Sequence, residues 1–137
     1  MKIYTDGSCL DQINNKYGGW CFCICTKERH TIIFGGEEDA TNNRMELIAV
    51  IEALKWIFPN SGEAIDINTD SKYVINCAEG RWKIKKNNDL WNKYFSLAEN
   101  MKIKYTWVRG HSGNKFNEFV DQVARNEAKS IKVLGHK

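Results

Sequence analysis

The sequence has one proline in 137 residues and no internal repeat, low-complexity segment or linker-like stretch. These absences argue against several domains joined by flexible connections, so we expect one domain over residues 1–137. A chain of this length buries about two thirds of its unfolded surface, so folding needs neither a cofactor nor a disulfide. No apolar run approaches the roughly 20 residues of a membrane span, which predicts a soluble protein without a membrane partner.

Neither sign of charge is in large excess. Charged residues make up 27% of the chain, and the formal net charge is +3. This mildly basic balance is compatible with a polyanionic partner but does not identify one.

The five cysteines are an odd number, and no secretory leader precedes them. We therefore expect a reducing, cytoplasmic compartment. Cys21, Cys23 and Cys25 alternate along a predicted strand and so share one face. A zinc site is the alternative interpretation, but residues two apart on a strand are about 6.8 Å apart. That spacing favours three small buried hydrophobic side chains over ligands that converge on one ion.

Alternating apolar residues and turn residues predict an α/β chain. Strands are expected at residues 2–6, 18–25, 31–35, 64–70 and 102–109, and helices at 47–57, 72–78, 90–99 and 117–129. The first three strands are expected to form an antiparallel meander. A strand, a helix and a strand follow, and the right-handed crossover that they imply places the fourth strand parallel to the first.

Glu46 lies at the first turn of a helix that is otherwise nearly all apolar. At about 100° per residue it faces about 120° to 180° away from Glu52 and Lys55, and therefore away from solvent. An isolated buried charge is costly, so this carboxylate must be capped, paired or bound to a cation. A capping box with Asn43, three residues earlier, is the simplest interpretation of Glu46 taken alone.

Other acidic residues are expected to meet Glu46. Asp6 and Asp70 follow adjacent parallel strands, at the edge where open α/β sheets bind ligands, and Asp121 faces inward from the last helix. Two unit charges about 4 Å apart repel by about 4 kcal/mol at an effective dielectric constant near 20. A cluster of acids therefore requires cations. Oxygen ligands favour Mg²⁺, with Mn²⁺ as a substitute, and two ions about 3.5 to 4 Å apart suit phosphoryl transfer.

Five motifs are specific when they occur in this order, although each is weak alone. They are Thr5-Asp6-Gly7-Ser8-Cys9, Thr41-Asn42-Asn43-Arg44-Met45-Glu46-Leu47, Thr69-Asp70-Ser71-Lys72-Tyr73-Val74, Asp89-Leu90-Trp91, and Trp107-Val108-Arg109-Gly110-His111-Ser112-Gly113 with Asn117, Glu118 and Asp121 after it. In these motifs the chain resembles type 1 ribonuclease H over essentially its whole length.

The resemblance implies a five-stranded mixed sheet in the order 3-2-1-4-5 with helices on both faces. It also implies a monomeric endonuclease that cuts the RNA strand of RNA–DNA hybrids and leaves 5′-phosphate and 3′-hydroxyl ends. By the same resemblance, Asp6, Glu46, Asp70 and Asp121 bind the metal ions, with Asp6 bridging both of them. His111 would assist product release or proton transfer.

The 2′-hydroxyl distinguishes RNA from DNA. The resemblance assigns contacts with it to Asn42 and Glu46, assisted by the backbone near Cys9. A further set of residues is assigned to the DNA strand: Thr41, Asn43 and Asn87. The ordinary alternatives are helix caps for Asn42 and Asn43 and a polar loop residue for Asn87.

Two departures from the family pattern stand out. Residues 10–17 replace a glycine- and proline-rich loop, and the segment 77–86 is too short for the basic insertion of many bacterial relatives. Arg81 and Lys83 beside Trp82 are nevertheless expected to track DNA phosphates, with the aromatic ring against a sugar. We expect weaker hybrid affinity than in relatives with the insertion. A solvated basic surface is the alternative.

Single residues also have ordinary interpretations. Asp6 and Asp70 could be turn residues, His111 an exposed loop residue and Asp121 a surface residue of a helix. For the whole chain, the alternatives are a transposase or integrase core and a non-catalytic hybrid-binding module. The first normally carries separate DNA-binding domains, and the second gains nothing from four repelling carboxylates.

Overall fold

The computed structural model describes residues 1–12, 15–59, 62–110 and 113–135. Its centre is a five-stranded sheet in the order β3-β2-β1-β4-β5, which confirms the predicted order. The elements are β1 (Lys2–Gln12), β2 (Asn15–Cys25), β3 (His30–Glu38), α1 (Asn42–Ile57), β4 (Ile65–Thr69), α2 (Lys72–Ala78), α3 (Asn88–Ala98), β5 (Ile103–Trp107) and α4 (Lys115–Gly135).

The pairing of the strands fixes where the acidic residues lie. β1 pairs with β2 in antiparallel fashion and with β4 in parallel, and β4 pairs in parallel with β5. Tyr4 stands opposite Asn68 in the parallel pair, so Asp6 and Asp70 are level, two residues further along. The predicted crossover between the first and fourth strands is confirmed.

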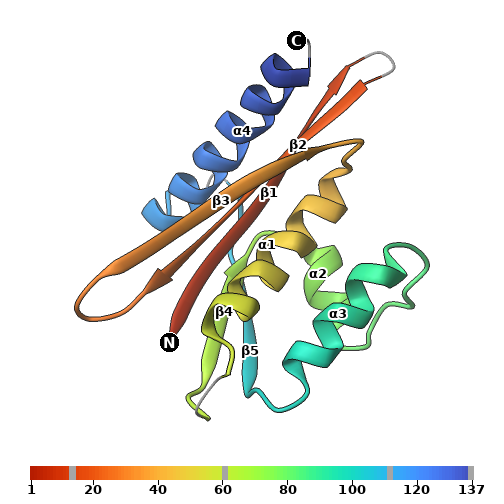
Figure 1. The fold of residues 1–137 in the computed structure, drawn as a ribbon. Helices are drawn as coiled ribbons and strands as arrows, with labels where there is room; N and C mark the ends of the chain where they lie inside the picture. The colour runs from red at the N-terminus through yellow and green to blue at the C-terminus, as the bar shows by residue number, and fades with distance from the viewer. Residues whose placement is uncertain (13–14, 60–61, 111–112, 136–137) are drawn as a thin grey trace.

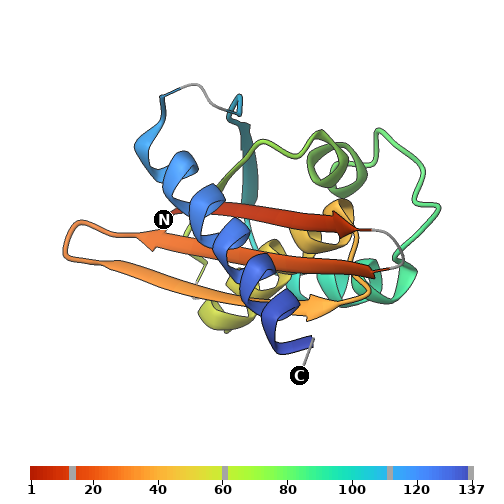
Figure 2. The ribbon, with the colours of Figure 1, turned by 90° about the horizontal axis from the view of Figure 1, so that it is seen from above.

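The helices cover the sheet in two layers (Figure 1). α1, α2 and α3 lie on one face, and α4 crosses β1, β2 and β3 on the other (Figure 2). α1 packs into the larger core and is buried on almost every side, which is why its sequence is nearly all apolar. Under α4 the core is smaller, and Cys21 and Cys23 pack there against Val120 and Ala124.

The first two strands are longer than the sequence predicted. Residues 10–12 continue β1 and residues 15–17 begin β2, with Cys9 opposite Gly18 and Leu10 opposite Tyr17. Polar residues favoured a loop there, but pairing across the hairpin extends both strands beyond the apolar pattern. The predicted loop over residues 10–17 is therefore wrong for the part of it that the structure describes. Within the described residues, no helix is long and apolar enough to cross a bilayer.

Candidate active site

Asp6 lies in the middle of β1 and is almost completely buried. Its Oδ1 atom accepts a hydrogen bond of 2.9 Å from the backbone N–H of Gly7. Its Oδ2 atom is also buried, and among the described residues it has no hydrogen-bond partner. A buried carboxylate oxygen without a donor is costly, so this atom calls for a proton or a cation.

Glu46 projects from the second turn of α1 and is only 6% exposed. The helix is capped by Thr41, whose hydroxyl accepts a hydrogen bond of 3.2 Å from the N–H of Arg44. The capping box with Asn43 is therefore wrong, because Asn43 already lies inside the helix. Glu46 instead accepts a hydrogen bond from the backbone N–H of Gly7 on β1.

Gly7 makes this contact possible. A Cβ atom at this position would overlap the backbone of Met45 and Glu46. Only glycine lets the strand come this close to the helix. Its single N–H then serves both Asp6 and Glu46, so a backbone group fixes the two carboxylates relative to each other.

Asp70 follows the end of β4 and precedes α2. Ser71 caps that helix, with its hydroxyl accepting from Val74 at 3.1 Å. The Trp107 indole N–H of β5 donates to the Asp70 carbonyl at 3.2 Å. Gly110 lies beside the Asp70 carboxylate. These contacts hold Asp70 at the end of the sheet and bring the loop after β5 next to it.

The carboxylates of Asp6, Glu46 and Asp70 meet, each offering an oxygen within 4.8 Å of the others. This confirms that the three acids converge. Asp121 approaches Asp6 from α4, where it also forms an ion pair of 3.1 Å with Arg125, and it lies outside the three-residue group. Its side chain is 26% exposed, whereas Asp6 and Glu46 are buried.

The crowding of like charges changes the acidity of the site. Burial is the main cause that raises the pKa of Asp6 to about 8; the neighbouring Glu46 carboxyl lowers it, and Asp70 and Asp121 raise it further. Burial likewise raises the pKa of Glu46 well above its ordinary value, with Asp6 and Asp70 adding to the effect. Without a cation, the pair therefore retains a proton at neutral pH.

The donors fit a hard divalent cation. The three clustered residues offer only carboxylate oxygens, and one of these is a buried oxygen without a donor. A cation would replace the retained proton and relieve the repulsion between the acids. The chemistry of the donors therefore favours metal binding over a purely structural role.

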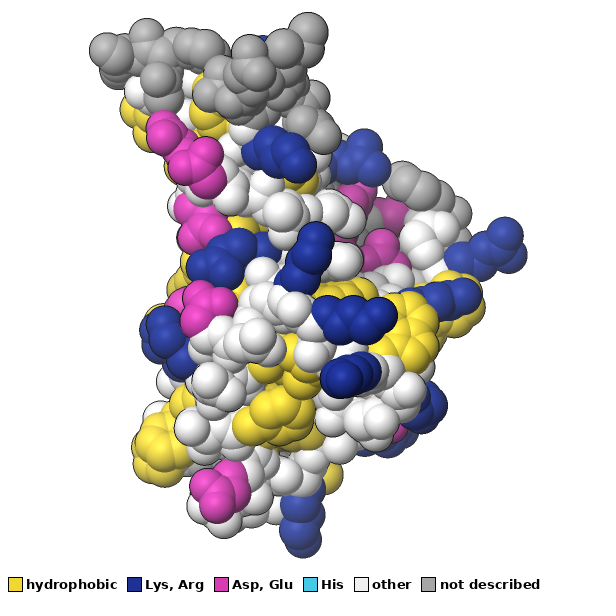
Figure 3. Space-filling model, turned by 90° about the vertical axis from the view of Figure 1, so that its right-hand side faces the viewer, with side chains coloured by type: hydrophobic (Ala, Val, Ile, Leu, Met, Phe, Trp, Pro, Cys, Tyr) yellow, Lys and Arg dark blue, Asp and Glu magenta, His cyan; other side chains and the backbone are white. Residues whose placement is uncertain are grey.

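A groove of about 670 Å³ runs from the start of α1 to the connection between α2 and α3. It is lined by Thr41, Asn43, Tyr73, Cys77, Arg81, Trp82, Lys83, Lys85, Lys86 and Asn87. Figure 3 shows Lys and Arg side chains around exposed hydrophobic ones on this side of the molecule, with Asp and Glu side chains in a hollow above them. The structure thus brings together all six residues predicted to contact the DNA strand.

The residues predicted to contact the RNA strand lie near these two features. Asn42 is exposed at the first turn of α1, and the Cys9 thiol lies 3.4 Å from the Ala40 carbonyl just before that helix. Arg81 lines the groove and forms an exposed ion pair of 2.8 Å with Glu79. His111 lies outside the described residues.

Sequence reasoning gave no role to Tyr73. Its hydroxyl accepts from the Asn87 amide at 3.1 Å and from the Trp91 indole N–H at 2.9 Å. Asn87 has a left-handed backbone, with φ of 60°, and Tyr73 fixes its side chain in the groove. The sequence did contain an indication of this role. Tyr73 belongs to the motif that contains Asp70, and Trp91 belongs to the Asp89-Leu90-Trp91 motif.

The sequence matches the RNase H family over residues 1–129. The chain belongs to the RNase H family. Ribonuclease H of Campylobacter jejuni strain 81-176 is 42% identical, with 96% of this chain and 92% of the relative covered. Ribonuclease H of Treponema denticola is 39% identical, with 90% and 94% covered. Family and relatives together imply ribonuclease H activity, with an RNA–DNA hybrid as substrate and metal ions in catalysis.

Solved structures show the same RNase H fold. The N-terminal RNase H domain of a Mycobacterium tuberculosis protein superposes with a TM-score of 0.76 at 22% identity, covering 98% of both chains. LC9-RNase H1, described as a type 1 RNase H with the type 2 active-site motif, gives 0.73 at 25% identity and covers 94% of this chain and 72% of that one. The strand order found here and these superpositions agree.

Proposed function

We propose that this RNase H chain, acting as a single catalytic domain, hydrolyses the RNA strand of RNA–DNA hybrids by two-metal-ion catalysis and leaves 5′-phosphate and 3′-hydroxyl ends. The observation that carries this proposal is the meeting of Asp6, Glu46 and Asp70 within 4.8 Å, with the buried Asp6 Oδ2 lacking a donor. Mg²⁺ is the proposed ion, with Mn²⁺ as a substitute.

The acids have different roles in this proposal. Asp6 would be central and hold both ions, Glu46 and Asp70 would hold the ion beside the leaving group, and Asp121 would help to hold the ion beside the water. The ions supply activation of water and stabilisation of charge on the phosphate. Gly7 orients Asp6 and Glu46 through its N–H. His111, which follows Gly110 in the sequence, is proposed to assist product release or proton transfer.

The two strands of the hybrid are proposed to contact different parts of the start of α1. Asn42 and Glu46, with the backbone near Cys9, face the 2′-hydroxyls of the RNA. Thr41, Asn43 and Asn87 lie on the groove side and would hold DNA phosphates. Proximity supports this assignment, because members of both sets lie at the start of α1 and Asn87 lines the same groove as Thr41 and Asn43.

A cleavage assay tests the proposed function. Labelled RNA–DNA hybrid, double-stranded RNA and double-stranded DNA are incubated with the protein, with Mg²⁺ and with chelator. We expect cleavage of the RNA strand of the hybrid only, in Mg²⁺ only, and products that a 5′-phosphate-dependent exonuclease degrades. Cleavage of duplex DNA, or activity that survives chelation, would contradict the proposal.

The basic groove gives a separate prediction about affinity. Lys83 and Trp82 are exposed at its edge, so Lys83→Ala should weaken hybrid binding and lower the slope of log Kd against log salt by about 1, the effect of one lost phosphate contact. Trp82→Ala should weaken binding with little change in slope, because stacking carries no charge. Anisotropy titrations in Ca²⁺ at several salt concentrations measure both quantities.

Lys27→Ala is the matched control, since Lys27 is an exposed lysine in the turn after β2, outside the groove. Its affinity and salt slope should equal those of the parent protein. If Lys83→Ala behaves as Lys27→Ala does, the groove is a solvated basic surface.

A further inference from the structure

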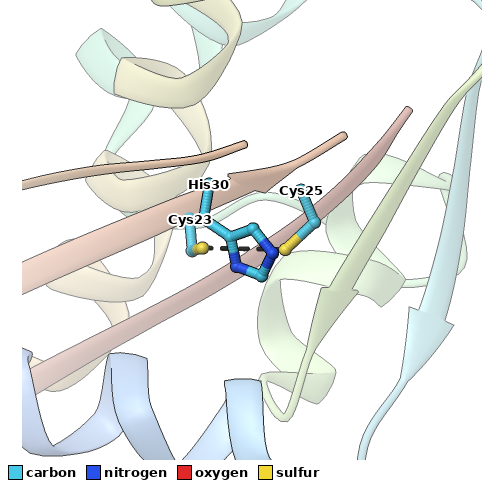
Figure 4. Close-up of side chains that lie close together, drawn as sticks. All are labelled: Cys23, Cys25 and His30. Atoms are coloured by element: carbon cyan, nitrogen blue, oxygen red, sulfur yellow. Dashed lines mark hydrogen bonds between the residues drawn. The ribbon is translucent and has the colours of Figure 1, made fainter. Parts of the chain in front are cut away.

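Two cysteines and a histidine lie close together on the face of the sheet that α4 covers. Cys25 of β2 stands directly opposite His30 of β3, and Cys23 is two residues earlier on β2 and shares the face. Figure 4 shows the three side chains pointing toward one another, with the imidazole between the two thiols in that view. One nitrogen and two sulfur atoms lie within 4.8 Å of one another.

The distance between Cys23 Sγ and Cys25 Sγ is 3.6 Å, and it is the most informative distance in the cluster. Two thiolates on a tetrahedral zinc ion, each at about 2.3 Å, stand about 3.8 Å apart. The side chains therefore converge far more than the spacing of about 6.8 Å between alternate strand residues suggested. The strand pattern alone offered Cys21 as the third ligand, whereas the structure supplies His30.

Neighbouring groups support the histidine. The ring centroids of His30 and Phe116 of α4 lie 4.9 Å apart, and Phe116 stacks on Tyr4 at 5.2 Å. The turn between Cys25 and His30 is closed by the Thr26 N–H donating to the Arg29 carbonyl at 3.0 Å. All three ligands are thus held by paired strands, and the exposed His30 side chain can adjust its rotamer.

We propose that Cys23, Cys25 and His30 form a binding site for one thiophilic divalent cation, of the zinc class, with a fourth position left for water. On binding, two S–H bonds break, two S–metal bonds and one N–metal bond form, and two protons leave to the solvent. No electron is transferred. Soft thiolates with an imidazole select zinc-like ions over Mg²⁺, so the site is chemically distinct from the carboxylates of the nuclease centre.

A redox or nucleophilic role fits these thiols less well. Burial, with the neighbouring Cys25, raises the pKa of Cys23 to about 12. Without a cation this thiol is protonated, and the thiolate is the form that attacks disulfides. A cation supplies the charge that releases the proton.

The site is also separated from the nuclease centre along the sheet. Asp6 stands opposite Cys21, and Cys25 lies four residues further along β2, which is about 14 Å of extended strand. An ion at Cys25 would connect β2 to β3 beside their turn and would not reach the clustered carboxylates. Its binding can therefore be measured independently of hybrid cleavage.

Titration with Co²⁺ as a spectroscopic substitute tests the proposal. The reduced, chelator-treated full chain receives Co²⁺, and the sulfur-to-cobalt charge-transfer absorption is followed; carboxylate sites cannot produce it. We expect saturation at one equivalent, loss of the band on adding Zn²⁺, and a Tm raised by Zn²⁺. Absence of this band in the reduced parent protein would overturn the proposal.

Cys25→Ala and His30→Ala each remove one ligand and should weaken Co²⁺ binding by at least about 10-fold. Cys77→Ala is the matched control: Cys77 is a buried cysteine of α2 outside the cluster, and its removal should leave the band unchanged. Circular dichroism verifies that each variant is folded. A Cys25→Ala titration identical to the parent's, or a Cys23–Cys25 disulfide as the stable form in air with no metal uptake after reduction, would refute the site.

Discussion

Asp70→Asn should abolish cleavage of RNA–DNA hybrid while leaving hybrid binding largely intact. The substitution keeps the size of the side chain but removes one of three carboxylates that meet within 4.8 Å. A metal ligand that acts in the transition state contributes several kcal/mol, so we expect kcat to fall by at least about 1,000-fold. Single-turnover cleavage in Mg²⁺ and anisotropy binding in Ca²⁺ measure the two effects separately.

Asp39→Asn is the control for this variant. Asp39 is exposed and has a left-handed backbone, with φ of 55°, a conformation that asparagine tolerates well. Its cleavage rate should match that of the parent protein. Residual activity of Asp70→Asn near the parent level would remove Asp70 from the proposed metal site.

Without divalent ions, the thermal stability of the protein should fall as the pH rises from about 4 to 8. The pKa of Asp6 is raised from 3.8 to about 8, and that of Glu46 is raised as well, so the folded protein binds protons that the unfolded chain has already released. This contribution is full below the unfolded pKa and is lost as the pH rises through the folded one. We expect Tm in chelator to drop by about 5 °C or more between pH 5.5 and 8.5.

Mg²⁺ should reverse this loss, and more strongly at pH 8.5 than at pH 5.5, because the cation competes with the retained proton. Asp6→Asn provides the matched variant: it removes the titrating group at almost constant volume, so its Tm profile in chelator should be flatter. Scanning calorimetry gives both profiles. A parent profile that rises with pH over this range, or equals that of Asp6→Asn, would contradict the assigned electrostatics.

The convergence of the acids could be predicted because it follows from topology. A right-handed crossover between two strands with matching ends places Asp6 and Asp70 level. The helical period of the segment after Glu46 then turned that carboxylate inward. These inferences need only local patterns and one general rule of chain connection.

Other features depend on contacts that a local pattern does not encode. The polar residues between Leu10 and Tyr17 look like a loop, and only pairing between two strands extends the hairpin through them. The meeting of Cys25 with His30 depends on the register between β2 and β3. The spacing of residues along β2 alone does not predict that register. The capping box with Asn43 failed because Thr41 starts the helix two residues earlier.

The amide of Gly7 has a consequence for how the nuclease centre meets its ligands. One rigid backbone group anchors a strand carboxylate and a helix carboxylate, so the folding of the core assembles this part of the site before any ion or hybrid arrives. These two side chains therefore lose their conformational entropy during folding and not on ligand binding. Binding of an ion then consists largely of replacing protons by metal at carboxylates that are already in position.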